Sequence, residues 1–161
     1  MPQWTLFEND FRAIDQALNE LIERTSAVSV HLVDRSGQLI TSAGRVGDLD
    51  PTAFASLIAA EFTANSELAQ MLGDKGVDAV VSEGKTRSVY SVMLAGRVIM
   101  ATVFDKRTTL GLVRFRATRA AKSLDGVFRI LLEKVGLNEP AFPEPTFAVA
   151  AGQEVDALFG D

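Results

Sequence analysis

Apolar side chains recur every three to four positions in three long segments of this chain, a spacing typical of helices that bury one face. The predicted helices span residues 8–24, 51–72 and 110–135. The middle helix has the clearest boundaries, because Asp50 supplies an N-cap, Pro51 takes the first helical position and Gly73 ends the helix. Gly136 ends the third helix in the same way.

Runs of β-branched and apolar residues between these helices predict five strands. The predicted strands span residues 27–34, 38–43, 78–83, 86–94 and 97–104. The turn "DRSG" joins the first two strands into a hairpin, and the last strand is apolar on both faces, as a central strand would be. The order of elements therefore predicts an α+β fold (α/β in the broad sense), an antiparallel sheet with helices on both faces.

Charge is distributed unevenly along the chain. Residues 1–138 hold 16 basic and 16 acidic side chains, whereas residues 139–161 hold five acidic and no basic ones, so the last 23 residues carry the whole net charge of −5. A neutral body argues against nucleic acid as a partner, since binding phosphates needs a net basic face. A basic stretch does occur, which we interpret as a solvated helix face. It contains Lys106, Arg107, Arg114, Arg116, Arg119 and Lys122.

The chain offers no recognisable catalytic, metal or cofactor site. It has no Cys, its single histidine, His31, lies in an apolar strand, and it has no glycine-rich phosphate-binding motif. The first ten residues do not read as a signal peptide. The longest stretch without a charge has ten residues, against the roughly 20 that a membrane-spanning helix needs. We expect a cytoplasmic protein that is not an enzyme, binds no metal or cofactor and does not insert into membranes.

The predicted helix at 51–72 is unusual because its only charges are Glu61 and Glu67. In projection, one face is apolar and is predicted to pack on the sheet: Phe54, Leu57, Ile58, Leu68 and Leu72. The opposite face is small and nearly uncharged: Ser56, Ala59, Ala60, Thr63, Ser66, Glu67 and Gln70. We interpret it as covered by a second copy or another protein, since small side chains lose little entropy when covered. The alternative is an exposed helix that is stable through helix propensity alone.

The acidic end of the chain carries its own pattern. Residues 138–152 hold three prolines and no periodic stripe, which is typical of a linker, while Val155, Leu158 and Phe159 form a short apolar stripe at helical spacing. We therefore divide the chain into a domain at 1–136, a linker at 137–152 and an amphipathic segment at 153–161. This flexible tail is predicted to bind a partner protein. The alternative is that it stays disordered or folds back on the chain's own basic helix.

Four strings resemble the Roadblock/dynein-light-chain family, and within it the bacterial polarity regulators. They are "LVDRSGQLITSAG" (32–44), "ASLIAA" (55–60), "VFDKRTTLGLVRFRATRA" (103–120) and "EVDALFGD" (154–161). The resemblance implies a five-stranded antiparallel sheet of order 2-1-5-4-3, with the first and third helices on one face and the second on the other. It also implies a homodimer that pairs through helix 51–72 and through sheet edges.

The same resemblance implies a function. Two copies would bind one small Ras-like GTPase of the MglA type and stimulate GTP hydrolysis without supplying a catalytic arginine, in cell polarity or gliding motility and concentrated at a cell pole. The implied partner-binding residues are Ala60, Thr63, Ala64 and Glu67, with Val155, Leu158 and Phe159 of the tail. Two alternatives stay open: a dimeric scaffold that does not accelerate turnover, and a domain that senses a small ligand.

Overall fold

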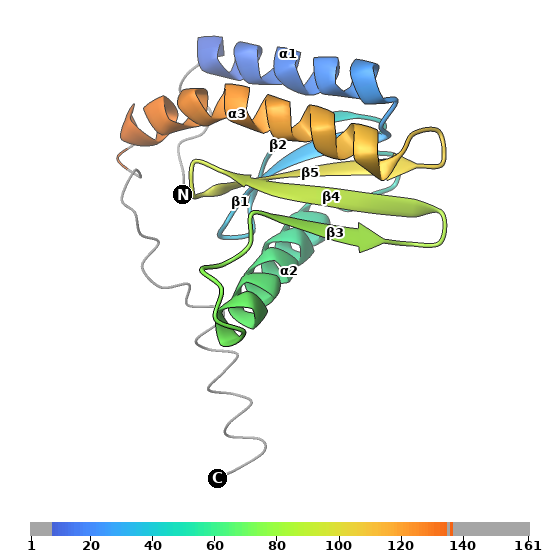
Figure 1. Cartoon of the computed structure of the whole chain (residues 1–161). Coiled ribbons are helices and arrows are strands. Elements are labelled where there is room, and N and C mark those ends of the chain that lie inside the picture. Colours follow the sequence, from blue (N-terminus) through green and yellow to red (C-terminus); the bar gives the residue numbers. More distant parts are fainter. Residues whose placement is uncertain (1–7, 135, 137–161) are drawn as a thin grey trace.

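A computed structural model describes residues 8–134 and residue 136 of the chain (Figure 1). Its elements, in chain order, are α1 (Glu8–Thr25), β1 (Ser29–Asp34), β2 (Leu39–Gly44), α2 (Pro51–Met71), β3 (Ala79–Glu83), β4 (Arg87–Leu94), β5 (Val98–Asp105) and α3 (Leu110–Lys134). Each lies within two residues of its predicted bounds. The predicted linker at 137–152 and the amphipathic segment at 153–161 lie outside the described residues.

The five strands form one antiparallel sheet in the order β2-β1-β5-β4-β3, which confirms the expected topology. Strand β1 is buried along its whole length and β5 along all but its last residue, as their position in the middle of the sheet requires. Helices α1 and α3 lie side by side on one face of the sheet, and α2 lies alone on the other (Figure 1). The predicted three-layer α+β arrangement is therefore confirmed.

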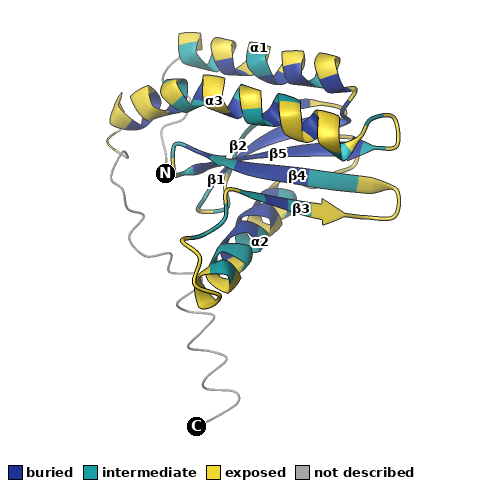
Figure 2. Cartoon of the chain, in the orientation of Figure 1, coloured by how far each residue is buried: buried dark blue, intermediate teal, exposed yellow. Residues whose placement is uncertain are grey.

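The sheet separates two hydrophobic cores of different size (Figure 2). The larger lies beneath α1 and α3 and is anchored by fully buried side chains such as Ile14, Leu18 and Phe128. The smaller lies beneath α2 and is built around Ile58, Phe62 and several alanines. The described helices include none that is long and apolar enough to cross a membrane.

Helix α2 begins and ends where its flanking residues predict. The Asp50 carboxylate accepts hydrogen bonds from the backbone N–H groups of Thr52 and Ala53, at 3.1 and 3.2 Å, and so satisfies two donors that have no partner within the helix. At the other end Gly73 takes a positive φ of 91°, which a residue with a Cβ adopts only with strain. The sequence thereby fixes the length of the one helix that covers this face of the sheet.

Candidate protein-binding surface on helix α2

Helix α2 is turned about its axis relative to the orientation that hydrophobicity predicts. Its buried residues are Ala55, Ile58, Ala59, Phe62 and Thr63. The predicted sheet-facing leucines are instead exposed, Leu57 by 70%, Leu68 by 58% and Leu72 by 84%. The prediction for that face was therefore wrong for these three residues. The buried face is rotated about the helix axis by about 100° from the predicted one, which is the angle between two successive residues.

The turn between β1 and β2 packs against one side of α2 in this orientation. Gly37, in the turn between β1 and β2, lies so near α2 that a Cβ placed on it would be 3.6 Å from the Ser56 Cα. The small side chains Ala55 and Ala59 face inward near this contact, where a leucine would hold the helix further away. The buried face of α2 thus combines small residues beside the turn with the larger Ile58 and Phe62, while Leu57 and Leu68 are left outside.

The exposed apolar side chains of α2 line up along its length, and we call this set the outer ridge. It comprises Leu57, Ala60, Ala64, Leu68 and Met71, which follow one another at three- or four-residue spacing. Met71 is 81% exposed, and Ala60 is the one half-buried member. A monomeric protein rarely leaves a continuous apolar strip on its surface, so the outer ridge has the character of a protein interface.

Two acidic residues border the outer ridge. Glu61 is half-buried, and burial raises the pKa of its carboxyl. Glu61 lies beside the outer ridge, on the same side of the helix as the exposed Leu57 and Leu68. Glu67 is exposed on the other side. A partner that covers the ridge would further desolvate Glu61, so a basic or hydrogen-bonding group is expected opposite it.

One flank of α2 meets the β1–β2 turn and encloses a pocket of about 190 Å³. Its lining residues are Arg35, Ser36, Gly37, Ser56, Ala59, Ala60 and Thr63. This lining is small and mostly uncharged, with one guanidinium at the rim. The pocket could accept a protruding side chain of a protein partner, because it adjoins the exposed part of the helix.

A buried ion pair holds the turn in place beside the pocket. Asp34 is fully buried, and its carboxylate accepts a 2.9 Å hydrogen bond from the Arg97 Nε. The other carboxylate oxygen accepts hydrogen bonds from the backbone N–H of Ser36, at 2.9 Å, and from its hydroxyl. The Gly37 N–H donates to the Asp34 carbonyl at 2.8 Å. Because these bonds satisfy the charge, the turn presents a fixed edge to a partner.

The residues implied as partner contacts fall into three groups. Ala60 lies on the outer ridge and also lines the pocket, and Ala64 and Glu67 are exposed. Thr63 is only 8% exposed and reaches a partner solely through the pocket. The tail residues fall outside the described part of the chain: Val155, Leu158 and Phe159.

Sequence reasoning missed Arg35 and the large members of the outer ridge. The available signal was that α2 carries large apolar residues on more sides than one sheet can cover, among them Leu57, Leu68 and Met71. Arg35 gave no signal, because its place beside α2 depends on how the hairpin folds over the helix.

His31 lies beneath α2 as a packed core residue. Its ring is 1% exposed, lies 4.6 Å from the Phe54 ring and has its Nε2 2.9 Å from the Ser29 hydroxyl. Burial lowers the pKa of His31 to about 4, so the ring is neutral at pH 7. Within residues 8–134, no three His, Asp or Glu side chains are grouped so as to hold a metal ion.

Known proteins share this architecture. MglB from Myxococcus xanthus is 36% identical, with 79% of this chain and 96% of that chain covered and a TM-score of 0.73. A structure described as MglB with a tetrameric arrangement is 26% identical, over 82% of this chain and 99% of the other, with a TM-score of 0.75. A Roadblock/LC7 domain from Streptomyces avermitilis is 18% identical over 71% of this chain and 96% of its own; its TM-score of 0.63 indicates a shared fold. No family model matches the chain.

Proposed function

Because this chain belongs to the Roadblock family, close to MglB, we propose that it is a homodimeric regulator that binds a small Ras-like GTPase of the MglA type and stimulates its GTP hydrolysis. Its fold is that of a regulator related to MglB and not of an enzyme. The observation that carries the proposal is the exposed, charge-poor outer surface of α2, which is suited to contact with protein.

The outer ridge is the part of α2 that we assign to self-association. Leu57, Leu68 and Met71 present large apolar side chains, while Ala60 and Ala64 between them allow a second backbone to come close. Two such ridges can pack against each other in a symmetric dimer, in which each surface meets its own copy. The exposed edge strand β3 lies on the same side of the molecule and offers a second place for pairing (Figure 1).

The pocket flank is the part that we assign to the GTPase. Ala60, Thr63, Ala64 and Glu67 extend from the pocket to the ridge, so a dimer would offer this flank twice, and two copies would bind one GTPase. The tail residues Val155, Leu158 and Phe159 would add a second contact with the GTPase. The complex would form in the cytoplasm, concentrated at a cell pole. The GTPase that it regulates would control cell polarity or gliding motility.

The regulator would act by selecting a conformation of its partner. A surface that binds the GTP-bound switch segments better than the GDP-bound ones holds the partner's own water-positioning and charge-stabilising groups in place, which speeds phosphoryl transfer. No group of this chain would contact the phosphate. The rigid β1–β2 turn supports this mechanism because a fixed surface loses little entropy on binding.

The test is single-turnover phosphate release from the GTP-loaded cognate GTPase, with and without this protein. We expect acceleration by at least about tenfold, which is about 1.4 kcal/mol of transition-state stabilisation. Ala60→Arg should abolish it, because Ala60 lies where the pocket flank meets the outer ridge, whereas Ala13→Arg on the exposed side of α1 should not. Sedimentation of the Ala60 variant shows whether the loss comes with loss of the dimer. Ala60 is a better probe than Thr63, whose burial would make an arginine disrupt the core. Intact binding without acceleration would favour the scaffold.

Arg35 allows a sharper version of this test, because it is the one charged residue among those that line the pocket. A catalytic arginine supplied in trans contributes about 10³–10⁵ to turnover. In the proposed mechanism Arg35→Ala weakens binding of the GTPase but leaves turnover of the saturated complex nearly unchanged. A loss of saturated turnover by three orders of magnitude would show that this chain does supply a catalytic group.

A further inference from the structure

The first half of α3 is strongly basic. Between Leu110 and Ser123 it carries Arg114, Arg116, Arg119 and Lys122 and no acidic residue. The pairs Arg116–Arg119 and Arg119–Lys122 lie three residues apart on the helix surface, where like charges repel. Its first turn has no acidic residue to favour the helix N-terminus. This charge therefore does not serve the stability of the helix.

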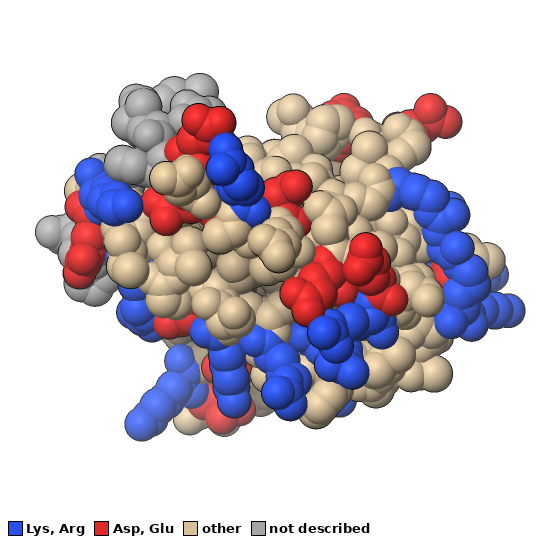
Figure 3. Space-filling model, turned by 90° about the horizontal axis from the view of Figure 1, so that it is seen from above, with Lys and Arg blue, Asp and Glu red and all other residues tan. Residues whose placement is uncertain are grey.

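Elsewhere in this two-helix layer every basic side chain pairs with an acidic one. Arg12 pairs with Glu8, Arg24 with Glu20, Arg129 with Asp125 and Lys134 with Asp10. Seen from above this layer, basic side chains gather along the margins of the molecule (Figure 3). In the described part of the chain, Arg116 and Arg119 pair with no acidic side chain; both instead lie over the Phe115 ring, 5.5 and 5.4 Å from its centre.

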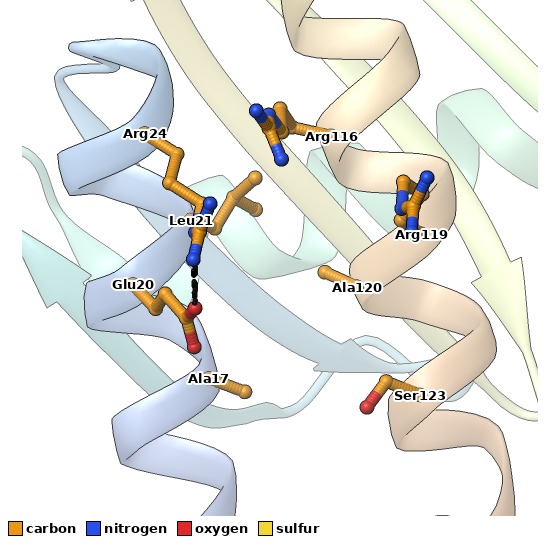
Figure 4. Close-up of a pocket in the computed structure, with 8 residues that line it drawn as sticks. All are labelled: Ala17, Glu20, Leu21, Arg24, Arg116, Arg119, Ala120 and Ser123. Carbon is orange, nitrogen blue, oxygen red and sulfur yellow. Dashed lines mark hydrogen bonds and ion pairs between the residues drawn. The ribbon is translucent and has the colours of Figure 1, made fainter.

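A groove between α1 and α3 collects three of these cations. It has a volume of about 300 Å³ and is lined by Ala17, Glu20, Leu21, Arg24, Arg116, Arg119, Ala120 and Ser123. Arg116 points from α3 toward α1, and small side chains leave the space beside it open (Figure 4). With three arginines and one glutamate, the lining carries a net charge of +2. Glu20 is already engaged by Arg24 at 2.9 Å.

Arg116 supplies the most specific observation. Its Nε is buried and has no hydrogen-bond partner among the described residues. A buried guanidinium N–H without an acceptor is costly, so an acceptor is expected at this position when the protein is in its working state. A carboxylate is the acceptor that matches a guanidinium best.

We propose that this groove binds the chain's own acidic segment at residues 153–161. That segment joins carboxylates at Glu154 and Asp156 to apolar side chains at Leu158 and Phe159. The groove offers arginines for the carboxylates, and the half-exposed Phe115, whose ring lies under two of these arginines, is the apolar surface beside it. The distribution of charge along the chain also pairs an acidic end with this basic groove, since the acidic excess lies entirely in residues 139–161.

The connecting segment has the reach that this contact requires. From Gly136 back to Ala120 the distance along α3 is about 24 Å, at about 1.5 Å per residue. The 16 residues from 137 to 152 reach about 55 Å when fully extended, and their three prolines favour a span above the roughly 20–24 Å of a glycine-rich chain of that length. Since the distance to the groove is well below the extended length, the segment can reach it, and the covalent link raises the effective concentration of the segment there.

This inference goes beyond the proposed function, because it concerns the regulator before it meets a GTPase. The segment that we assign to a contact with the GTPase would rest on α3 in the absence of that partner. The groove would thus act as a competing site and would hold the tail back until the GTPase displaces it. Measurements on the regulator alone test this contact, so their outcome does not depend on whether GTP hydrolysis is stimulated.

The chain has no cysteine, which permits a direct experiment on the full-length protein. A nitroxide spin label attached through Gly160→Cys broadens the NMR signals of backbone amides near it. We expect strong broadening at residues 17–24 of α1 and 116–123 of α3 and little at α2. Adding salt should weaken it, since the contact is largely between exposed charges. Broadening spread evenly over the surface, or confined to α2, would overturn the proposal.

Two variants and one mixture complete the test. Arg116→Gln combined with Arg119→Gln should remove the broadening at the groove, whereas Arg129→Gln, on the same helix but paired with Asp125, should leave it. Loss in all variants alike would mean that the groove arginines are not specific, and would contradict the proposal. In a mixture of spin-labelled and isotope-labelled chains, equally strong broadening would assign the segment to a second copy and overturn binding within one chain.

Discussion

The two outer surfaces of this molecule are built differently, although both are made by helices that pack on the same sheet. The outer side of α2 carries apolar side chains along its length, and only Glu61 and Glu67 are charged. The outer side of α1 and α3 carries many charges, and six of them form three ion pairs between residues one helical turn apart. The second surface is suited to water, whereas the first is suited to another protein.

The two cores beneath these helices differ in the same direction. The core under α1 and α3 is the larger and has Thr102 as a buried polar side chain on its face of β5, whereas the smaller core under α2 adjoins the buried polar side chains of Ser29 and His31. Ser91 is buried as well, and its hydroxyl has no partner among the described side chains. The contrast teaches that the α2 layer gains less from burial within one chain. A second chain that covers its outer surface would make up part of the difference.

Removing the outer ridge should have the largest effect. Leu57→Glu combined with Leu68→Glu places two charges in the proposed dimer interface, and two interface anchors of about 2 kcal/mol each correspond to weakening by about a thousandfold. Sedimentation should then show single chains that keep their helical circular dichroism, because both leucines are exposed in one chain. Ile130→Glu is the matched control, since Ile130 is 53% exposed on α3. If Ile130→Glu weakened dimer formation equally, the two outer surfaces would not differ in the way proposed.

Acid should weaken the fold through the α2 side. The pKa of His31 falls to about 4 on folding, from 6.5, so the unfolded chain binds the proton more readily. The stability linked to neutral His31 is present above pH 6.5 and is lost as the pH falls toward 4, with a limit of about 3 kcal/mol. Urea denaturation between pH 7 and 4.5 should show this loss in the natural protein and a smaller loss in His31→Gln. Parallel curves for the two proteins would contradict it.

Breaking the ion pairs on the outside of α1 and α3 should have the smallest effect. Glu8→Gln and Arg129→Gln each remove an exposed pair, and such pairs contribute less than about 1 kcal/mol. Urea denaturation at low and high salt should give small changes that vanish in high salt. A loss of several kcal/mol from either substitution would show that this surface is more than a solvated face.

Most of the fold could be predicted from the sequence because its signals are local. The cap at Asp50, the stop at Gly73 and the spacing of apolar residues on each helix depend on neighbours along the chain. The strand order could not be derived from such patterns and came from the resemblance to a family. The buried pair of Asp34 and Arg97 joins distant positions, so no local pattern predicted it.

The orientation of α2 could not be predicted because it depends on two contacts at once. Projection of the sequence ranks faces by hydrophobicity, which puts Leu57 and Leu68 inside. In the structure the buried face instead combines Ala55 and Ala59 with Ile58 and Phe62, and Leu57 and Leu68 stay exposed. Projection assumes that the most apolar face of a helix packs on the rest of its own chain. That assumption fails for a helix that packs on its own sheet with one face and on another protein with the other.

The central claim is that protein covers the outer ridge of α2 in the working assembly, and methionine oxidation tests it most directly. Met71 is 81% exposed in one chain, whereas Met100 is fully buried and serves as the internal reference. Hydrogen peroxide oxidises accessible methionines to sulfoxides, which mass spectrometry counts at each position. We predict that Met71 oxidises slowly in the natural protein and rapidly in the Leu57→Glu, Leu68→Glu variant, with Met100 protected in both. Rapid oxidation of Met71 in the natural protein, unchanged when the GTP-loaded GTPase is added, would contradict the account.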